Sequence, residues 1–169
     1  LRLRVPGWLS TPVPGSLYHY VEPGNDQPVI TVNGGSAEYT MDNGYAVIKR
    51  NWKKGDIVTM ELPMKVRRIA SNAEVKQNAN RIALQYGPIL YCIEGEKEGL
   101  KAGNVILPDN TVFQISYEPS LLGGVNVVRF DAPVLTVGNN GLSVSTEIKK
   151  VTAIPYFSWN NRGANDMQV

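Results

Sequence analysis

Apolar and polar side chains alternate from the first residues of the chain. From Leu1 to Val5 every second residue is apolar and the two residues between are arginines, and a Pro-Gly pair then interrupts the pattern at positions 6 and 7. Side chains of a β-strand point to opposite faces in turn, so this pattern gives one buried and one hydrated face. The segment is therefore predicted to be a strand.

Similar strand patterns recur along almost the whole chain. They predict strands at Val29–Val32, Tyr45–Arg50, Ile57–Leu62, Val66–Ile69, Ile82–Tyr86, Ile89–Ile93, Val112–Tyr117, Val125–Phe130, Leu142–Glu147 and Val151–Pro155. Turn signals separate these segments roughly every ten residues, a spacing typical of β-sandwiches and barrels.

Glycine marks the predicted turns. Asn33–Gly35 ends one strand and Asp42–Gly44 predicts a tight turn, because glycine adopts positive φ without steric cost. Lys53–Asp56 lies between two predicted strands and favours a hairpin that joins Tyr45–Arg50 to Ile57–Leu62.

Helical periodicity is weak throughout, and 16 glycines and 11 prolines are spread along the chain. The best helical candidate, Ser71–Gln77, is too short to support a helix prediction. The predicted fold class is therefore all-β: an antiparallel β-sandwich, jelly-roll-like, in two packed sandwich units of which the first is incomplete.

Composition supports a folded chain and excludes some partners. Of 169 residues, 43% are hydrophobic and 19% charged, which is ordinary globular usage. No apolar run reaches the ~20 residues of a membrane-spanning helix, so no membrane partner is expected. The net charge is +2 with scattered basic residues, whereas nucleic-acid binding requires a dense basic stripe. No nucleic-acid partner is expected.

The chain offers little catalytic chemistry. Cys92 is the only cysteine and lies in an apolar strand pattern, which indicates a buried side chain and excludes both an internal disulfide and a multi-cysteine zinc site. His19 is the only histidine and has no nucleophile nearby in the sequence. Carboxylates are numerous, but those of Asp42 and Asp56 lie in turn motifs where they bond backbone N–H groups. We expect no catalytic residue, metal ligand or cofactor in this chain.

Large aromatic residues are the one feature suited to binding. Trp8, Trp52, Tyr156 and Trp159 could stack on the faces of sugar rings, as flat apolar rings do in carbohydrate-binding sandwiches. Large aromatics also dominate packing within and between small β domains. The four residues are candidate carbohydrate or interdomain contacts, and core or interdomain packing is the favoured interpretation.

A series of short motifs resembles glycoside hydrolase family 127. In chain order they are Leu3–Trp8, Val32–Gly34, Gly44–Asp56, Leu62–Met64, Arg81–Glu94 and Ala153–Gly163. Each motif alone is weakly specific, but their common order covers nearly the whole chain. They resemble the region that follows the catalytic barrel in this bacterial family of β-L-arabinofuranosidases and their relatives.

The resemblance implies a division of labour between domains. In the family an N-terminal (α/α)6 barrel performs retaining hydrolysis with a cysteine nucleophile, zinc-binding cysteines and a glutamate, and none of those motifs is present here. Cys92 matches a strand residue of the downstream β region, so no catalytic residue is carried over. By the same resemblance, residues 1–69 correspond to the later part of a middle β-sandwich and residues 70–169 to a C-terminal β-sandwich.

The sequence thus favours a non-catalytic accessory region of a glycoside hydrolase, packing on the catalytic barrel of the parent chain and aiding dimerisation. An independent carbohydrate-binding module that binds a glycan is the alternative. The chain has no initiator Met and opens within a strand pattern, so we expect a fragment whose unpaired edges favour homo-oligomers. Its compartment stays open between the bacterial cytoplasm and periplasm.

Overall fold

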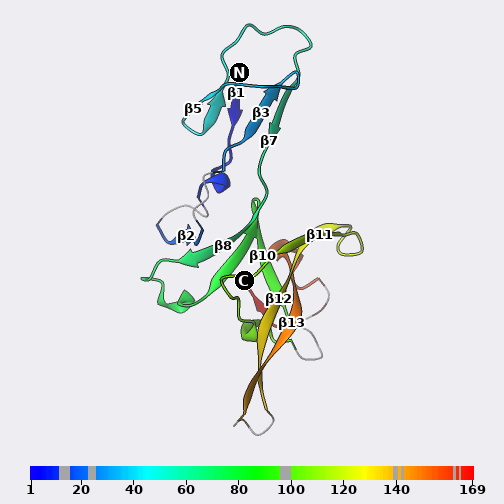
Figure 1. Cartoon of the computed structure of the whole chain (residues 1–169). Helices are drawn as coiled ribbons and strands as arrows, with labels where there is room; N and C mark the ends of the chain where they lie inside the picture. The colour runs from blue at the N-terminus through cyan, green and yellow to red at the C-terminus, as the bar shows by residue number, and fades with distance from the viewer. Residues whose placement is uncertain are drawn as a thin grey trace.

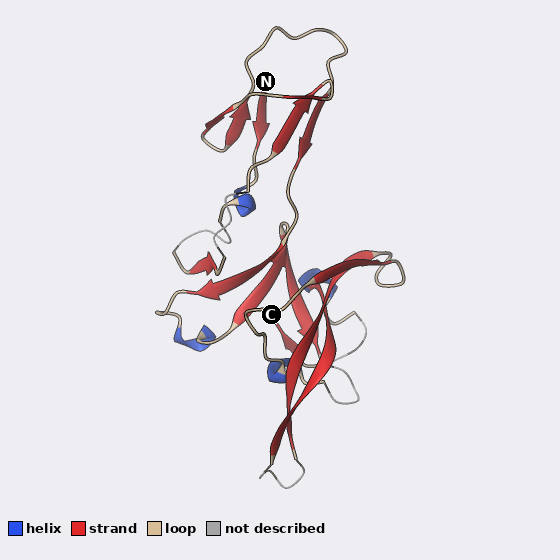
Figure 2. Ribbon diagram, in the orientation of Figure 1, coloured by secondary structure: helices blue, strands red, loops and turns tan. Residues whose placement is uncertain are grey.

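The computed structural model describes residues 1–11, 16–22, 26–95, 100–138, 141, 143–161, 163 and 165–169. Its strands pair antiparallel throughout, which confirms the predicted all-β class (Figure 2). The helical segments of the described residues are four 3-10 turns: η1 (Gly7–Leu9), η2 (Lys76–Asn78), η3 (Ala102–Asn104) and η4 (Tyr156–Ser158). The helical candidate at 71–77 is thus reduced to one short turn at its end.

The strands form three sheets. In chain order they are β1 (Arg2–Arg4), β2 (Tyr18–Tyr20), β3 (Val29–Val32), β4 (Gly35–Ser36), β5 (Thr40–Asp42), β6 (Tyr45–Val47), β7 (Val58–Glu61), β8 (Val66–Ser71), β9 (Ile82–Tyr86), β10 (Ile89–Glu94), β11 (Gln114–Glu118), β12 (Val125–Val137), β13 (Val144–Pro155) and β14 (Met167–Gln168). Sequence reasoning found most of these, but missed the short strands β2, β4 and β5.

The first unit consists of two three-stranded sheets, with orders β1-β6-β5 and β4-β3-β7, and lies at the top of Figure 1. Its core joins Ile30 of one sheet to Ala46 of the other, with Ile48 beside them. Partly buried Leu3, Val5, Ala37, Tyr39, Val58 and Met60 pack around these three. The alternation noted at residues 1–5 thus directs Leu3 and Val5 to the core.

Asn-Gly pairs make two tight turns of this unit. Asn33 and Gly34 connect β3 to β4, Asn43 and Gly44 connect β5 to β6, and all four residues have positive φ. Both central residues of a type I′ hairpin turn require positive φ, which asparagine and glycine tolerate best. The predicted turn at 42–44 is confirmed.

The predicted hairpin between residues 45–50 and 57–62 is wrong. β6 pairs with β1 and β5, whereas β7 pairs with β3 in the other sheet. The intervening segment crosses from one sheet to the other, and its turn is closed by the Asp56 carboxylate, which accepts hydrogen bonds from Lys53 N and Asn33 Nδ2. The turn role of Asp56 is confirmed. Asp42 instead accepts from the Asn43 side chain and forms an ion pair with Arg2.

The second unit is an eight-stranded sheet of order β11-β12-β13-β10-β9-β8-β2, with β14 paired to β10. One face carries the larger core, around Leu84, Tyr91, Val128, Phe130, Ala132, Val151 and Ala153. The other face carries a second core of Cys92, Val125, Val127 and Ile154. The near-continuous apolar runs of these strands are explained by burial of both faces. Cys92 is a core residue, as its sequence context indicated.

β2 joins the two units. It belongs to the N-terminal part of the chain but pairs with β8, placing His19 opposite Ala70 at the sheet edge. β8 runs without interruption from Val66 to Ser71, so the expected boundary between residues 69 and 70 falls inside this strand.

β12 and β13 are the longest strands and form a hairpin that projects from the rest of the sheet (Figure 1). The sequence predicted two strands, 142–147 and 151–155, where the structure has one, because Ile148, Lys149 and Lys150 continue the register with β12. Residue 142, where the first of the two was expected to begin, lies outside the described residues.

The different burial of two isoleucines on β13 predicts different effects of the same substitution on stability. Ile154 is 2% exposed and Ile148 is 65% exposed on the same strand. Removing one methylene at a buried site leaves a cavity, so Ile154→Val should lower the free energy of unfolding by about 1 kcal/mol. Ile148→Val should change it by less than about 0.5 kcal/mol. Urea unfolding of both variants tests this, and equal losses would contradict the burial described.

Candidate functional site

Two consecutive arginines on β8 form the most extensive polar cluster at the junction of the two units. Successive residues of a strand point to opposite faces, so Arg67 and Arg68 extend in opposite directions. Both side chains are more than nine-tenths buried. A buried arginine is stable only when its charge and its N–H donors are matched, so their partners decide what this cluster does.

Arg67 holds the N-terminal segment against the large sheet. Its Nη2 donates to the Leu9 carbonyl at 2.9 Å and to the Asp26 carboxylate. Its guanidinium carbon lies 4.5 Å from the centre of the Tyr20 ring, within the range of a cation–π contact. These bonds tie β8 to Leu9 and Asp26, which precede Arg67 by 58 and 41 positions in the sequence.

Tyr20 extends this contact in two directions. Its hydroxyl donates to the Trp8 carbonyl at 2.8 Å and accepts from Gln85 Nε2 at 3.1 Å. The Gln85 amide also donates to the Gly87 carbonyl at 2.6 Å, in the β9–β10 turn. The network therefore connects η1, β2, β8 and β9 through buried hydrogen bonds. Two buried guanidinium nitrogens, Arg67 Nη1 and Arg68 Nε, have no hydrogen-bond partner among the described residues.

Arg68 joins the opposite face of β8 to a more distant loop. Its Nη1 donates to Glu22 at 2.7 Å, and its Nη2 donates to the carbonyls of Pro108 and Thr111 at 3.2 and 3.3 Å. Its guanidinium also lies over the Phe113 ring at 5.4 Å. We call Arg67, Arg68 and their partners the junction cluster.

Charges balance across the junction cluster. A cleft of about 450 Å³ beside it is lined by the cations Lys65, Arg67 and Arg68 and by the carboxylates of Glu22, Asp26 and Asp109, among other residues. The three cations and three carboxylates neutralise one another, so the cleft lacks the excess positive charge that would capture an anion. The cluster is suited to fixing the connection between β1 and β3 against the large sheet.

The environment of the junction cluster lowers the pKa of the Asp26 carboxyl. The hydrogen bond that Lys65 Nζ donates at 2.8 Å lowers the pKa of Asp26, partial burial opposes the shift, and the charges of Lys65 and Arg67 add to the lowering. Asp26 therefore remains ionised in the folded chain at pH values where a free aspartate would be protonated.

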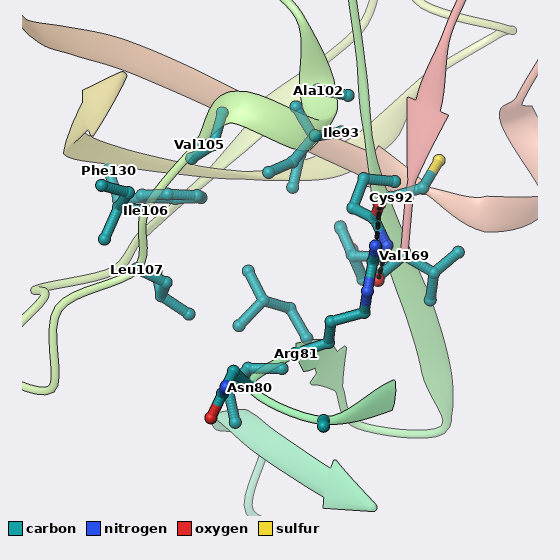
Figure 3. Close-up of a pocket in the computed structure, with 17 residues that line it drawn as sticks. Asn80, Arg81, Cys92, Ile93, Ala102, Val105, Ile106, Leu107, Phe130 and Val169 are labelled. Carbon is teal, nitrogen blue, oxygen red and sulfur yellow. Dashed lines mark hydrogen bonds between the residues drawn. The ribbon is translucent and has the colours of Figure 1, made fainter. Parts of the chain in front are cut away.

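A separate pocket of about 430 Å³, with a wall that is about half polar and half apolar, opens on the larger core (Figure 3). Leu84 and Tyr91 form part of its wall. In Figure 3 Phe130, Ile106 and Leu107 lie on one side of the opening, across from Val169. At the rim Arg81 Nη1 donates to Gln168 Oε1 at 2.7 Å. Of the described residues that line it, Arg81 has the one charged side chain, and none is Asp, Glu or His.

This pocket lacks acid–base chemistry. Burial, with a smaller contribution from Tyr86, raises the pKa of Tyr91 to about 12, and its hydroxyl donates to the Asn126 carbonyl at 2.8 Å. Glycoside hydrolysis generally requires two carboxyl groups that flank the reacting bond.

Across the described ranges, no group of three or more His, Cys, Asp and Glu residues could hold a metal ion, and no helix is long and apolar enough to cross a membrane.

The four aromatic candidates do not form one site. Tyr156 and Trp159 stack on each other at the end of β13, with ring centres 6.2 Å apart and planes 11° apart, and both remain partly exposed. Trp52 lies in the first unit beneath the Arg50 guanidinium, 5.3 Å from its ring centre. Trp8 lies in η1, where its carbonyl takes part in the junction cluster.

The structure also identifies residues that the sequence reasoning did not select. Arg67 and Arg68 were considered only as part of a short basic run, yet two adjacent arginines inside a strand pattern are a usable signal. One of them must point to the buried face and therefore needs a partner. Glu94 was likewise missed: it is buried at the end of β10 and accepts a hydrogen bond from Asn160 N.

The chain thus has the features of a non-catalytic pair of β units with buried arginines near their junction. Comparison with known protein families identifies both units. Residues 1–64 match the model of the GH127 middle domain of beta-L-arabinofuranosidase, and residues 66–169 match the model of the glycoside hydrolase family 127 C-terminal domain. The chain belongs to glycoside hydrolase family 127, as its motifs indicated.

Relatives agree over almost the full chain. A non-reducing end beta-L-arabinofuranosidase of Bifidobacterium longum subsp. longum is 27% identical over 180 residues, 99% of this chain and 25% of the relative. The solved GH127 beta-arabinofuranosidase BT3674 has a TM-score of 0.89 at 33% identity, covering 99% of this chain and 26% of that one. Ara127N-Se, a GH127 beta-L-arabinofuranosidase from Geobacillus stearothermophilus T6, has a TM-score of 0.81 at 32% identity, covering 99% and 25%. The chain thus spans about a quarter of the length of these relatives.

The junction cluster predicts a pH-dependent stability difference. Because the folded pKa of Asp26 is lowered, its ionised form stabilises the fold above the unfolded pKa of about 3.9, and this stabilisation is lost as pH falls through the folded pKa. Asp26→Asn should therefore cost about 1–2 kcal/mol at pH 7. The deficit should shrink below about pH 3.5.

Urea unfolding of the natural chain and Asp26→Asn between pH 7 and pH 3 measures this deficit. Glu147→Gln is the matched control, because that carboxylate is well exposed and its ion pair with Lys149 is long, at 3.8 Å between Oε2 and Nζ. Its effect should stay within about 0.5 kcal/mol throughout. An Asp26→Asn deficit that is the same at both ends of the pH range would contradict the role given to Asp26.

Proposed function

We propose that this chain is a non-catalytic accessory region of a glycoside hydrolase, which packs on a catalytic domain of the same polypeptide. The observation that carries the proposal is the match of both units to the middle and C-terminal domains of family 127, together with a length about one quarter of the relatives. In such an arrangement the junction cluster keeps the two units in one relative orientation, so that they present a fixed surface to the catalytic domain.

The side chains of this chain support that role. Zinc, which the family resemblance implies for the catalytic barrel, does not fit the residues present here: Cys92 is enclosed by Val127 and Ile154 in the core. A thiol in an apolar environment is a poor nucleophile because burial disfavours its thiolate. A contribution to dimerisation is part of the same proposal, since apolar side chains such as Val112 and Phe157 are exposed.

The proposal predicts that the isolated chain has no arabinofuranosidase activity. It should release no arabinose from an aryl β-L-arabinofuranoside above the buffer rate, with or without zinc and a thiol reductant, because its one cysteine, Cys92, is buried in the core. The Bifidobacterium longum relative is the positive control. Turnover that persists in Cys92→Ala would reject the proposal, since it would show catalysis by other residues of this chain.

Carbohydrate binding is a second candidate, supported by one observation. Tyr156 and Trp159 form a parallel, partly exposed stack, and the outer face of a ring in such a pair can lie against a sugar. In this role the chain would direct the enzyme to its polysaccharide. Interdomain packing of the same rings is the competing interpretation.

Calorimetric titration separates these two roles for Trp159. If the rings bind sugar, arabinan or pectic oligosaccharides should give a measurable affinity that falls at least about tenfold in Trp159→Ala, while the melting transition is retained. Trp52→Ala, in the other unit, is the matched control. Flat titrations with the natural chain would end this second candidate and leave the packing role.

A further inference from the structure

The projecting half of the β12–β13 hairpin has two unlike faces. β13 pairs with β10 only near its end, from Ala153 to Pro155, whereas its pairing with β12 continues out to Val144. We call residues 131–137 and 144–150 the ribbon. In Figures 1 and 2 it extends beyond the other strands of the sheet.

Register assigns each side chain of the ribbon to a face. Cα partners across an antiparallel pair direct their side chains to the same side. Pro133 pairs with Ile148, Leu135 with Thr146 and Val137 with Val144. Toward its tip this face therefore carries Pro133, Leu135, Val137, Val144 and Ile148, with Thr146 among them, and at its base it carries the pair Asp131 and Lys150. We call the five residues from Pro133 to Ile148 the apolar face.

The opposite face of the ribbon is different. Its outer pairs are Val134 with Glu147 and Thr136 with Ser145. Val134 is buried and bridges to Val105, while the polar members reach water. This is the composition expected of a ribbon whose one side is hydrated.

The apolar face is strongly exposed in this chain. Val137, Val144 and Ile148 are 57%, 66% and 65% exposed. Three β-branched side chains gathered on one face of a projecting hairpin, with polar residues on the other, are typical of a surface that another element covers.

We propose that this apolar face docks onto the catalytic domain of the same polypeptide. The inference rests on the proposed function and adds the surface through which the packing occurs. Relatives are about four times as long as this chain, so a large covalently linked domain is available to cover the ribbon.

Area favours a linked domain over a second copy of the chain. The three exposed side chains offer on the order of 200 Å² of apolar surface. A stable interface between separate proteins buries about 800 Å² per partner. A linked domain is present at an effective concentration near the millimolar range, so a patch of this size contributes usefully to an intrachain interface. The partner surface should itself be apolar.

Hydrogen exchange in a chimera tests the proposal. In the chimera this chain replaces the matching quarter of the Bifidobacterium longum relative. Peptides covering Val144–Lys150 should exchange at least about tenfold more slowly in the chimera than in the 169-residue chain. The double variant Val144→Thr/Ile148→Thr should lose that protection in the chimera and exchange like the natural chain when isolated.

A matched control and three outcomes decide the matter. Val112→Thr replaces a side chain that is 74% exposed outside the ribbon, and it should leave the protection unchanged. Protection elsewhere in the chimera but not at the ribbon would overturn this inference and keep the proposed function. A chimera that gains no protection anywhere in the chain would overturn both. Ribbon protection in the isolated chain that grows with concentration would show a second copy as the occupant and reject the inference.

Discussion

The unbroken antiparallel register of β12 and β13 is the constraint on which most of this structure depends. Ten consecutive Cα pairs, from Val128 with Ala153 to Val137 with Val144, fix which face every side chain of the hairpin takes. Near β10 the register places Val127 and Ile154 in one core and Val128 and Ala153 in the other. Further out, the same register exposes an apolar face to the surroundings of the chain.

Buried arginines complement this apolar framework. A sheet with cores on both faces has little room for charge, yet β8, the neighbour of the edge strand β2, carries Arg67 and Arg68, and both are more than nine-tenths buried. The carboxylates and carbonyls that match them come from the N-terminal segment and from the loop near residue 110. Removing one partner would leave an unmatched buried charge, so the connection between β1 and β3 is held against the large sheet. A fixed arrangement is what an accessory region needs in order to present one surface to its neighbour.

Sequence reasoning recovered the elements whose signals are local. The Asn-Gly pairs at 33–34 and 43–44 identify turns because both residues need positive φ there. Strand pairing is not local, which is why β6 and β7 were expected to form a hairpin although they lie in different sheets. Ile148 fell between the two predicted strands 142–147 and 151–155. Neither face of the ribbon is fully buried, so the apolar–polar alternation that marks a strand is weak there. Among candidate residues, the stacking of Tyr156 and Trp159 could not be read from the sequence, since it depends on how η4 follows β13. The family of the chain was predicted from the ordered short motifs, because strand periodicity alone is shared by many β proteins.

The central claim is that one continuous strand has a buried and an exposed segment, and thiol labelling tests it most directly. In a Cys92→Ala background, Ile148→Cys and Ile154→Cys place the same probe on the same face of β13. The account predicts that the thiol at position 148 reacts nearly as fast as one in an unfolded peptide, and that the thiol at position 154 reacts at least about 100-fold more slowly, because it is reached only when the sheet opens. Equal labelling rates at the two positions would contradict the register and the division of surfaces that follows from it.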